Sequence, residues 1–461
     1  MNRATSNVLE YLEHSAEHYP DKTAFEDEKK TSTYRETWEA ARRIGSALAG
    51  MSEARRPIPV LGEKSVETVQ TFFGIVNAGC FYILLDPKQP VSRLQQILKT
   101  LDATLLVVMS EDHRKTVDAL GFDGKIVYYE QMKDSEEDGD VLDVIRANAA
   151  DVDPLYVNFT SGSTGIPKGV VVSHRSVIDF MEYFPELFEI TEEDVIGNQA
   201  PFDFDVSVKD IYATLKTGAT MVMIPKQYFS FPTKLLDYLC ERNVTTLIWA
   251  VSAVCIISTL KGFDYKVPEK INKVLFSGEV MPIKHLNIWR KYLPKAQFVN
   301  LYGPTEITCN CTYYKIDREF QKGDVLPIGV PFPNEKVFLL DEEEELVQEA
   351  NKKGELCVAG TALALGYYQA PEQTRRAFVQ NPLNPYYPET IYRTGDLAYY
   401  NETGELCYAS RKDFQIKHMG HRIELGEIEA SAWGVDKIKN CACVFDEAAD
   451  KIIFIYEGKV K

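Results

Sequence analysis

The distribution of hydrophobic and polar positions predicts an α/β architecture for most of the chain. Up to about residue 324, amphipathic segments with apolar residues every three or four positions alternate with short apolar runs bounded by turn residues. Such alternation is typical of folds in which helices pack on sheets. Pro59 lies in the first predicted strand, residues 58–62, so this strand is expected to begin there or to lie at a sheet edge. The segments that carry the pattern are residues 7–20, 34–50, 58–78, 104–127, 155–180 and 219–260.

A different pattern begins near residue 324. Short strand-like runs follow one another, separated by Gly and Asn turns, which predicts a β-rich unit. With 461 residues the chain is longer than the roughly 250 to 300 residues that one core supports, so at least two packed units are expected. The strands predicted in the β-rich part are residues 336–340, 356–358, 397–400 and 406–409.

Composition and charge narrow the functional classes. A net charge of −17 argues against broad contact with nucleic acid or anionic membranes, so any bound phosphate must be held by a local site. An acidic helical pattern near the N-terminus replaces the apolar core of a signal peptide, and the apolar stretches are shorter than the roughly 20 residues that span a bilayer. A cytoplasmic protein with its nine cysteines reduced is therefore expected.

The most informative segment lies between two apolar strands, at residues 156–172. Glycines allow backbone amides to turn toward an anion, hydroxyls donate further hydrogen bonds, and a lysine adds positive charge. We therefore predict a polyphosphate site rather than a flexible Ser/Gly linker, although the spacing is not that of a Walker loop. The residues concerned are Thr160, Ser161, Gly162, Ser163, Thr164, Gly165 and Lys168.

This loop resembles the signature of the adenylate-forming superfamily, and especially of the adenylation domains of nonribosomal peptide synthetases. Six further segments resemble core motifs of that family in the same order, and residues 277–282 are similar to free-standing D-alanine:carrier-protein ligases. The resemblance implies an α/β, adenylate-forming fold: layered sheets in a large N-terminal core at residues 1–412, with its β-rich part at about 324–412, then a smaller α+β subdomain. The six segments are residues 78–87, 202–212, 300–306, 354–368, 392–397 and 411–429.

The resemblance also implies a site for ATP and Mg²⁺. Thr160 to Gly165 would wrap the β- and γ-phosphates, and Lys168 would steady the departing pyrophosphate. Thr305 would contact the α-phosphate, and Glu306 would bind Mg²⁺, which suits a carboxylate beside phosphate oxygens.

The resemblance also implies which residues bind the adenine base and the ribose of ATP. Tyr302 would stack on adenine, and Asn300 would bond its exocyclic amine. Asp396 would accept hydrogen bonds from both ribose hydroxyls, with Arg411 close by.

Asp205 matches the family's aspartate that pairs with the α-ammonium of an amino acid. An alternative is that Asp205 caps the helix predicted to start near Ser207.

Lys209 is the anomaly in the implied pocket, since a buried ammonium needs an acidic partner unless its stem reaches water. We expect a small amino acid, with Trp249 occupying volume, and keep aspartate or glutamate open because of Lys209. The other implied wall residues are Val206, Leu275, Ser277, Leu301, Cys309 and Asn310.

Asp413 resembles the hinge before the family's small C-terminal domain. Residues 413–461 are about half as long as that domain, and they lack its Asn-Gly-Lys motif with the essential lysine. The resemblance therefore implies that the chain by itself is an impaired enzyme. Either the chain was shortened at its C-terminus, or a partner supplies the lid.

Together these features predict a ligase that activates an amino acid as aminoacyl-AMP, releases pyrophosphate and loads a phosphopantetheine carrier protein. An acyl-CoA or aryl-CoA ligase of the same superfamily is an alternative, which Asp205 disfavours. A module that binds ATP and an amino acid without turnover is a third.

Overall fold

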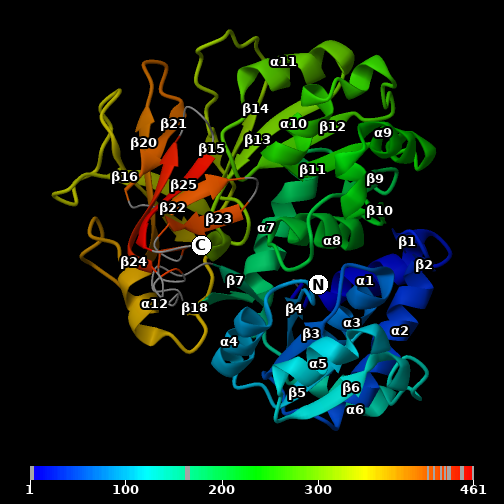
Figure 1. The fold of residues 1–461 in the computed structure, drawn as a ribbon. Coiled ribbons are helices and arrows are strands. Elements are labelled where there is room, and N and C mark those ends of the chain that lie inside the picture. The colour runs from blue at the N-terminus through cyan, green and yellow to red at the C-terminus, as the bar shows by residue number, and fades with distance from the viewer. Residues whose placement is uncertain are drawn as a thin grey trace.

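The computed structural model describes residues 5–160, 167–412, 415–418, 421–425, 428–429, 432, 438–446 and 451–458 (Figure 1). Two large sheets and a smaller one form the body of the molecule. Ser161, Gly162, Ser163, Thr164 and Gly165 of the predicted phosphate loop, and the predicted hinge Asp413, lie outside the described residues.

The seven-stranded sheet has the order β18-β8-β7-β4-β3-β5-β6. Strands β3 to β7 pair in parallel, whereas β8 is antiparallel to both β7 and β18. The strands are β3 (Pro57–Leu61), β4 (Phe81–Leu85), β5 (Leu105–Val108), β6 (Lys125–Tyr128), β7 (Pro154–Thr160), β8 (Lys168–Ser173) and β18 (Gly366–Tyr367).

The prediction that Pro59 marks an edge or the start of a strand was wrong. Pro59 is the third residue of β3, which lies between β4 and β5. Pairing with β5 begins only at Val60, one residue after the proline, so the missing amide hydrogen interrupts no ladder on that side.

The nine-stranded sheet has the order β15-β14-β13-β12-β11-β9-β10-β1-β2. Its strands are β1 (Thr23–Glu26), β2 (Thr31–Thr33), β9 (Val195–Asn198), β10 (Thr220–Met223), β11 (Thr246–Ala250), β12 (Lys273–Ser277), β13 (Gln297–Tyr302), β14 (Thr312–Lys315) and β15 (Val330–Pro331). The helices are α1 (Leu9–His18), α2 (Tyr34–Ala49), α3 (Val66–Asn77), α4 (Val91–Leu101), α5 (Arg114–Leu120), α6 (Gly139–Ala147), α7 (His174–Leu187), α8 (Val206–Thr217), α9 (Pro232–Glu241), α10 (Val251–Thr259), α11 (Ile283–Tyr292) and α12 (Pro371–Ala377).

Alternation of side chains along the strands creates three apolar layers. Tyr82 and Leu84 of β4 join the core shared by both large sheets and by α1, α3, α7 and α8, whereas Phe81 and Ile83 face the core beneath α4 and α5. The outer face of the nine-stranded sheet is covered by α9, α10 and α11, at the top of Figure 1. This arrangement confirms the predicted layered α/β fold.

The β-rich part forms a third sheet of five strands, and its core is continuous with the end of β13. Tyr302 and Ile307 pack with Leu356, Val358 and Tyr392. The prediction of a β-rich region is confirmed. The strands are β16 (Glu335–Leu340), β17 (Gly354–Gly360), β19 (Phe378–Gln380), β20 (Thr390–Tyr400) and β21 (Leu406–Arg411).

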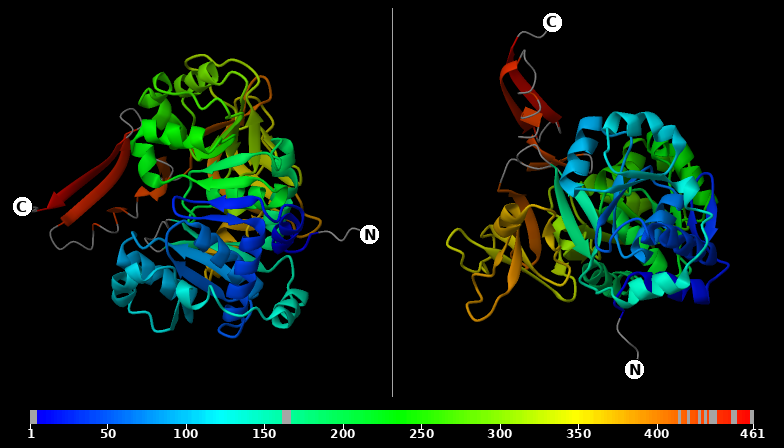
Figure 2. Two further views of the ribbon diagram at one scale, coloured as in Figure 1. Left: turned by 90° about the vertical axis from the view of Figure 1, so that its right-hand side faces the viewer. Right: turned by 90° about the horizontal axis from the view of Figure 1, so that it is seen from below.

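Two hairpins follow the third sheet. They are β22 (Gln415–His418) with β23 (His421–Glu424), and β24 (Ile438–Asp446) with β25 (Lys451–Gly458). Figure 2 shows the red β24–β25 hairpin extending away from the body. Among the helices of the described part of the chain, none has the length and apolar character needed to cross a bilayer.

A buried ion pair holds the amino ends of the parallel strands together. The Lys273 ammonium lies 2.9 Å from Asp194, and Thr245 and Thr246 both donate hydroxyl hydrogen bonds to the same carboxylate. These residues precede or begin β9, β11 and β12. The strands are therefore aligned at one end, which sets where their opposite ends lie.

His174, the first residue of α7, ties the N-terminal segment to the core. The amide of Val8 donates to its Nδ1 at 3.3 Å, and burial lowers the pKa of His174 to about 3. The neutral imidazole is thus favoured in the folded state. The stability it contributes is complete above its ordinary pKa of about 6.5 and is lost as the pH falls from there toward 3.

We predict that His174→Gln flattens this acid sensitivity. Between neutral pH and about pH 4, the free energy of unfolding of the native protein should fall by about 3 kcal/mol more than that of the variant. Urea denaturation at several pH values measures the difference. Exposed His18 serves as control, and His18→Gln should retain the native pH profile. Parallel profiles for His174→Gln and the native protein would contradict the prediction.

Candidate active site

The predicted site residues gather where parallel strands end. Strands β9, β11, β12 and β13 run in parallel and finish on the same side of the nine-stranded sheet. Open α/β sheets bind ligands beyond the carboxyl ends of their strands. Asp205 follows β9, Ser277 ends β12, and Tyr302 ends β13 just before Glu306.

Lys168 and Glu306 meet at one aromatic ring. The Lys168 ammonium lies 5.3 Å from the centre of the Tyr367 ring, and the Tyr367 hydroxyl donates to Oε1 of Glu306 at 2.8 Å. Glu306 is fully buried, and Thr305 precedes it in the same 3₁₀ turn, Thr305–Ile307. The structure thus brings the three predicted catalytic residues together.

Thr160 ends β7 directly opposite Lys168 in the antiparallel pair with β8. Its hydroxyl is buried and has no hydrogen-bond partner among the described residues. A buried hydroxyl without a partner is costly in a finished structure, so this atom suits a site that a ligand completes.

Tyr302, Asp396 and Arg411 form a second group, between β13 and the third sheet. The Tyr302 hydroxyl donates to Asp396, and Arg411 forms an ion pair with the same carboxylate at 2.9 Å. Asp396 is only 1% exposed. Burial and the Asp396 charge hold the pKa of Tyr302 well above its usual range, so the hydroxyl remains a donor.

Strand β13 separates the two halves of the predicted site. Asn300 and Tyr302 point to one face, and the Asn300 amide donates to the Pro327 carbonyl at 2.8 Å. Leu301 points to the opposite face, into the core between the large sheets. One strand therefore supplies residues to both the predicted nucleotide side and the predicted amino-acid side.

Asp205 occupies the N-cap position of α8 but makes no capping hydrogen bond with its side chain. The structure therefore does not support the alternative that the Asp205 side chain caps this helix. The Cys309 thiol donates to the Asp205 carbonyl at 3.0 Å, and Val206, the next residue, is half-buried. Burial, followed by the charge of Asp205, raises the pKa of Cys309, so the thiol stays protonated.

Lys209 lies one turn further along α8 and is completely buried. Its ammonium donates to Oδ1 of Asn310 at 2.7 Å and lies 3.4 Å from the Ser277 hydroxyl. Burial lowers the pKa of Lys209. The stem therefore does not carry the charge to water. Three predicted wall residues, Leu275, Leu301 and Cys309, lie in the core between the large sheets.

Trp249 is not brought to this wall. It pairs with Phe276 in the β11–β12 ladder, and both side chains belong to the outer core beneath α9 to α11. Its indole nitrogen donates to the Gly197 carbonyl at 2.7 Å. Because strand side chains alternate, Trp249 faces away from Leu275 and Ser277.

Two tyrosines were not among the predicted site residues. Tyr367 lies between Lys168 and Glu306, and the only sequence signal was its place in the 354–368 motif. Tyr156 is 1% exposed, and its hydroxyl has no hydrogen-bond partner in the described part of the chain. Burial, with smaller contributions from Cys309 and Asp205, holds the pKa of Tyr156 well above its usual range. Its position before the glycine-rich loop did not indicate a buried hydroxyl, because burial depends on the packing of segments that are distant in the chain.

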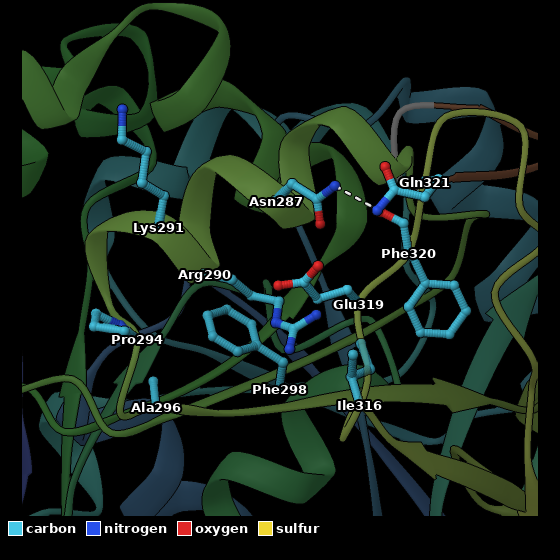
Figure 3. A pocket seen from close by; sticks show the side chains of 10 residues that line it. All are labelled: Asn287, Arg290, Lys291, Pro294, Ala296, Phe298, Ile316, Glu319, Phe320 and Gln321. Atoms are coloured by element: carbon cyan, nitrogen blue, oxygen red, sulfur yellow. Dashed lines mark hydrogen bonds between the residues drawn. The ribbon is translucent and has the colours of Figure 1, made fainter.

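A separate cavity of 520 Å³ lies on the far face of the nine-stranded sheet (Figure 3). The side chains of Phe298 and Ile316 lie at its base, Arg290 points into it, and Asn287 bonds to the Phe320 carbonyl. None of its lining residues belongs to the predicted site.

Comparisons with known proteins found related sequences. A family model described as AMP-binding enzyme matches residues 12–368. Tyrocidine synthase 3 of Brevibacillus parabrevis is 33% identical over 443 residues, which cover 95% of this chain and 6% of that protein. The chain thus spans only a small part of the length of that relative. D-alanine–D-alanyl carrier protein ligase of Listeria monocytogenes serovar 1/2a is 30% identical over 458 residues, covering 97% of this chain and 88% of that protein.

A solved structure has the same fold. It is an NRPS protein containing adenylation and PCP domains, bound to a vinylsulfonamide inhibitor. The TM-score is 0.85 at 24% identity, and the match covers 98% of this chain and 76% of that chain. At this identity the similarity establishes the shared architecture.

The buried Asp396 group gives a stability prediction. Asp396→Ala leaves the Arg411 guanidinium, 10% exposed, without its carboxylate, and should lower the free energy of unfolding by about 3 to 5 kcal/mol. Urea denaturation measures the loss. Glu372→Ala is the control, because its ion pair with Arg375 is exposed and should contribute little. Equal midpoints for the two variants would refute a structural role for Asp396.

Proposed function

The chain belongs to the AMP-binding enzyme family, and from this membership we propose that it joins an amino acid to the AMP half of ATP with release of pyrophosphate. We further propose that the aminoacyl-AMP is passed to a phosphopantetheine carrier protein. The relatives support these steps, since one is named a tyrocidine synthase and another a carrier protein ligase.

One observation supports the proposal: the predicted nucleotide residues lie in two groups of contacting side chains, which the segment from Tyr302 to Glu306 joins. Lys168 and Glu306 contact the same tyrosine, and Tyr302, four residues before Glu306, bonds to Asp396. Cationic, acidic and hydroxyl groups are thus available within one region for a triphosphate, a metal ion and a ribose.

The reaction needs charge neutralisation and alignment more than acid or base groups. We assign Lys168 to the departing pyrophosphate and Thr305 to the α-phosphate. Thr160, with its hydroxyl unpartnered among the described residues, is assigned to the β- and γ-phosphates. Asp396, oriented by Tyr302 and Arg411, would accept the ribose hydroxyls.

Glu306 fits a magnesium site. A carboxylate is a hard oxygen ligand, and Mg²⁺ is usually held by one or two carboxylates together with phosphate oxygens. Bound there, Mg²⁺ would neutralise charge on the phosphates. The hydrogen bond from Tyr367 holds the Glu306 carboxylate in place.

We assign Asp205 to the α-ammonium of the amino acid. The absence of a side-chain cap supports this assignment, because the carboxylate is not committed to the helix it precedes. An acid without an amine would leave this carboxylate uncompensated, which disfavours fatty and aryl acids.

We also propose a cytoplasmic location. The nine cysteines are all free thiols, and six of them are buried. Reduced thiols are the norm in compartments kept reducing, where ATP is also supplied.

The role of Asp205 can be tested with Asp205→Ala. Amino-acid-dependent exchange of pyrophosphate into ATP should fall at least about 100-fold, because the ammonium loses its only assigned counter-ion. ATP binding, measured by calorimetry, should not change, since Asp205 is assigned to the amino acid and not to the nucleotide.

Two other results would count against the proposal. Unchanged exchange kinetics in Asp205→Ala would reject the assignment of that residue. Exchange supported by fatty or aryl acids, and by no amino acid, would identify an acyl-CoA or aryl-CoA ligase instead.

The metal assignment predicts that Glu306→Gln slows exchange by about 100-fold or more and raises the Mg²⁺ concentration needed for half-maximal rate. The amide still accepts the Tyr367 hydrogen bond, so the melting temperature should be retained. Glu335→Gln is the matched control. Burial raises the pKa of Glu335 to about 8, so the amide mimics its neutral form and the exchange rate should be unchanged. An unaltered Mg²⁺ dependence in Glu306→Gln would place the metal elsewhere.

A further inference from the structure

The Lys209 ammonium is buried without an acidic partner. It is fully inaccessible, and the two side chains that accept its hydrogen bonds, Asn310 and Ser277, are both neutral. Within the described residues no carboxylate lies within 4.0 Å of it, and Asp205 and Asp210 act only at longer range. A buried charge held only by neutral groups is costly, and such groups are usually retained for function.

The amide of Asn310 is oriented by this contact. A lysine ammonium has no acceptor, so Oδ1 must face it and the Asn310 amide nitrogen must turn away. That nitrogen donates no hydrogen bond to any described residue, although Asn310 is only 1% exposed. Lys209 and Asn310 thus offer adjacent N–H donors, one of them charged.

A third buried donor is Tyr156. The Tyr156 hydroxyl is buried, has no partner in the described part of the chain, and lies in the electrostatic range of Cys309 and Asp205. Ser277 adds a hydroxyl beside Lys209. The lining therefore has several donors and a net cation, which is the complement of a carboxylate.

Two other buried ionisable side chains, Lys64 and Asp210, are linked through Asn198. The Asn198 amide donates to Asp210 at 2.5 Å, and the Lys64 ammonium donates to the same side chain of Asn198 at 3.0 Å. Lys64 and Asp210 are thus bridged, and burial shifts the pKa of each to about 7. With Asp205 assigned to the substrate ammonium, Lys209 is the positive charge left over.

We propose that the amino acid activated by this protein carries a carboxylate in its side chain, and that Lys209 and Asn310 bind that carboxylate. The inference rests on the proposed function and specifies its substrate class. An acidic side chain would balance the charge of Lys209, while the backbone amine and carboxyl group engage Asp205 and the nucleotide.

Pyrophosphate exchange with the full 461-residue chain tests the proposal. The probes are the L- and D-forms of aspartate and glutamate, with asparagine, glutamine, serine and alanine for comparison. An acidic amino acid should exceed its own amide by about 100-fold or more in kcat/KM, because the amide leaves the buried ammonium uncompensated. Calorimetric titration of the same amino acids should give the same order of affinity.

Lys209→Met removes the charge and keeps the length of the side chain. It should lower kcat/KM for the acidic substrate by about 100-fold while leaving the amide within a fewfold. Without amino acid, the variant should melt no lower than the native protein, since it removes an unmatched buried charge. Lys216→Met is the control on the same helix, because Lys216 pairs with Glu182 near the surface, and it should change none of these values.

The outcomes separate the two proposals. Exchange with serine or alanine and not with acidic amino acids would overturn the inference and leave the proposed function standing. Exchange with no amino acid would overturn the proposed function. In that case calorimetry still decides the inference, since aspartate and glutamate binding that Lys209→Met does not weaken would refute it.

Discussion

The turn after β13, residues 303–311, is the constraint on which both halves of the site depend. Gly303 has no room for a side chain, because a Cβ there would lie 2.5 Å from the Asn310 Cα. Thr308 and Cys309 follow with φ of +53° and +77°, a conformation that costs non-glycine residues of order 1 kcal/mol or more each. Hydrogen bonds from their side chains to Ala362 and Asp205 hold the turn closed. As a result, Glu306 faces Tyr367 on one side while Asn310 faces Lys209 on the other.

Electrostatics then distinguish the two sides. On the nucleotide side the buried Asp396 carboxylate is paired with Arg411 and is thereby held in one orientation. On the amino-acid side Lys209 is bound only by neutral groups among the described residues. A group that is poorly compensated in the free protein gains most from a ligand of opposite charge. The buried charge of Lys209 therefore lowers the stability of the free protein while it favours a ligand of opposite charge.

The layered fold was accessible from the sequence because each helix and strand has its own periodicity. The alternation up to about residue 324 and the β-rich pattern beyond it were both confirmed. Pro59 and Trp249 show what the local sequence pattern could not predict. Whether a strand lies inside a sheet, and which face its residues take, depends on pairing with β5 and β12, which are distant in the chain. Local pattern cannot supply that register.

The sequence by itself predicted most of the residue types of the site, because motifs such as residues 300–306 keep these residues at fixed short spacings. The family and the types of residue in the site follow from such local order. Tertiary structure alone decided that Tyr367 joins Lys168 to Glu306, that the Tyr156 hydroxyl is buried, and that Lys209 has no acidic partner among the described residues. Burial and the partners of a charge are properties of segments brought together from far along the chain, and they set the free energy of that charge.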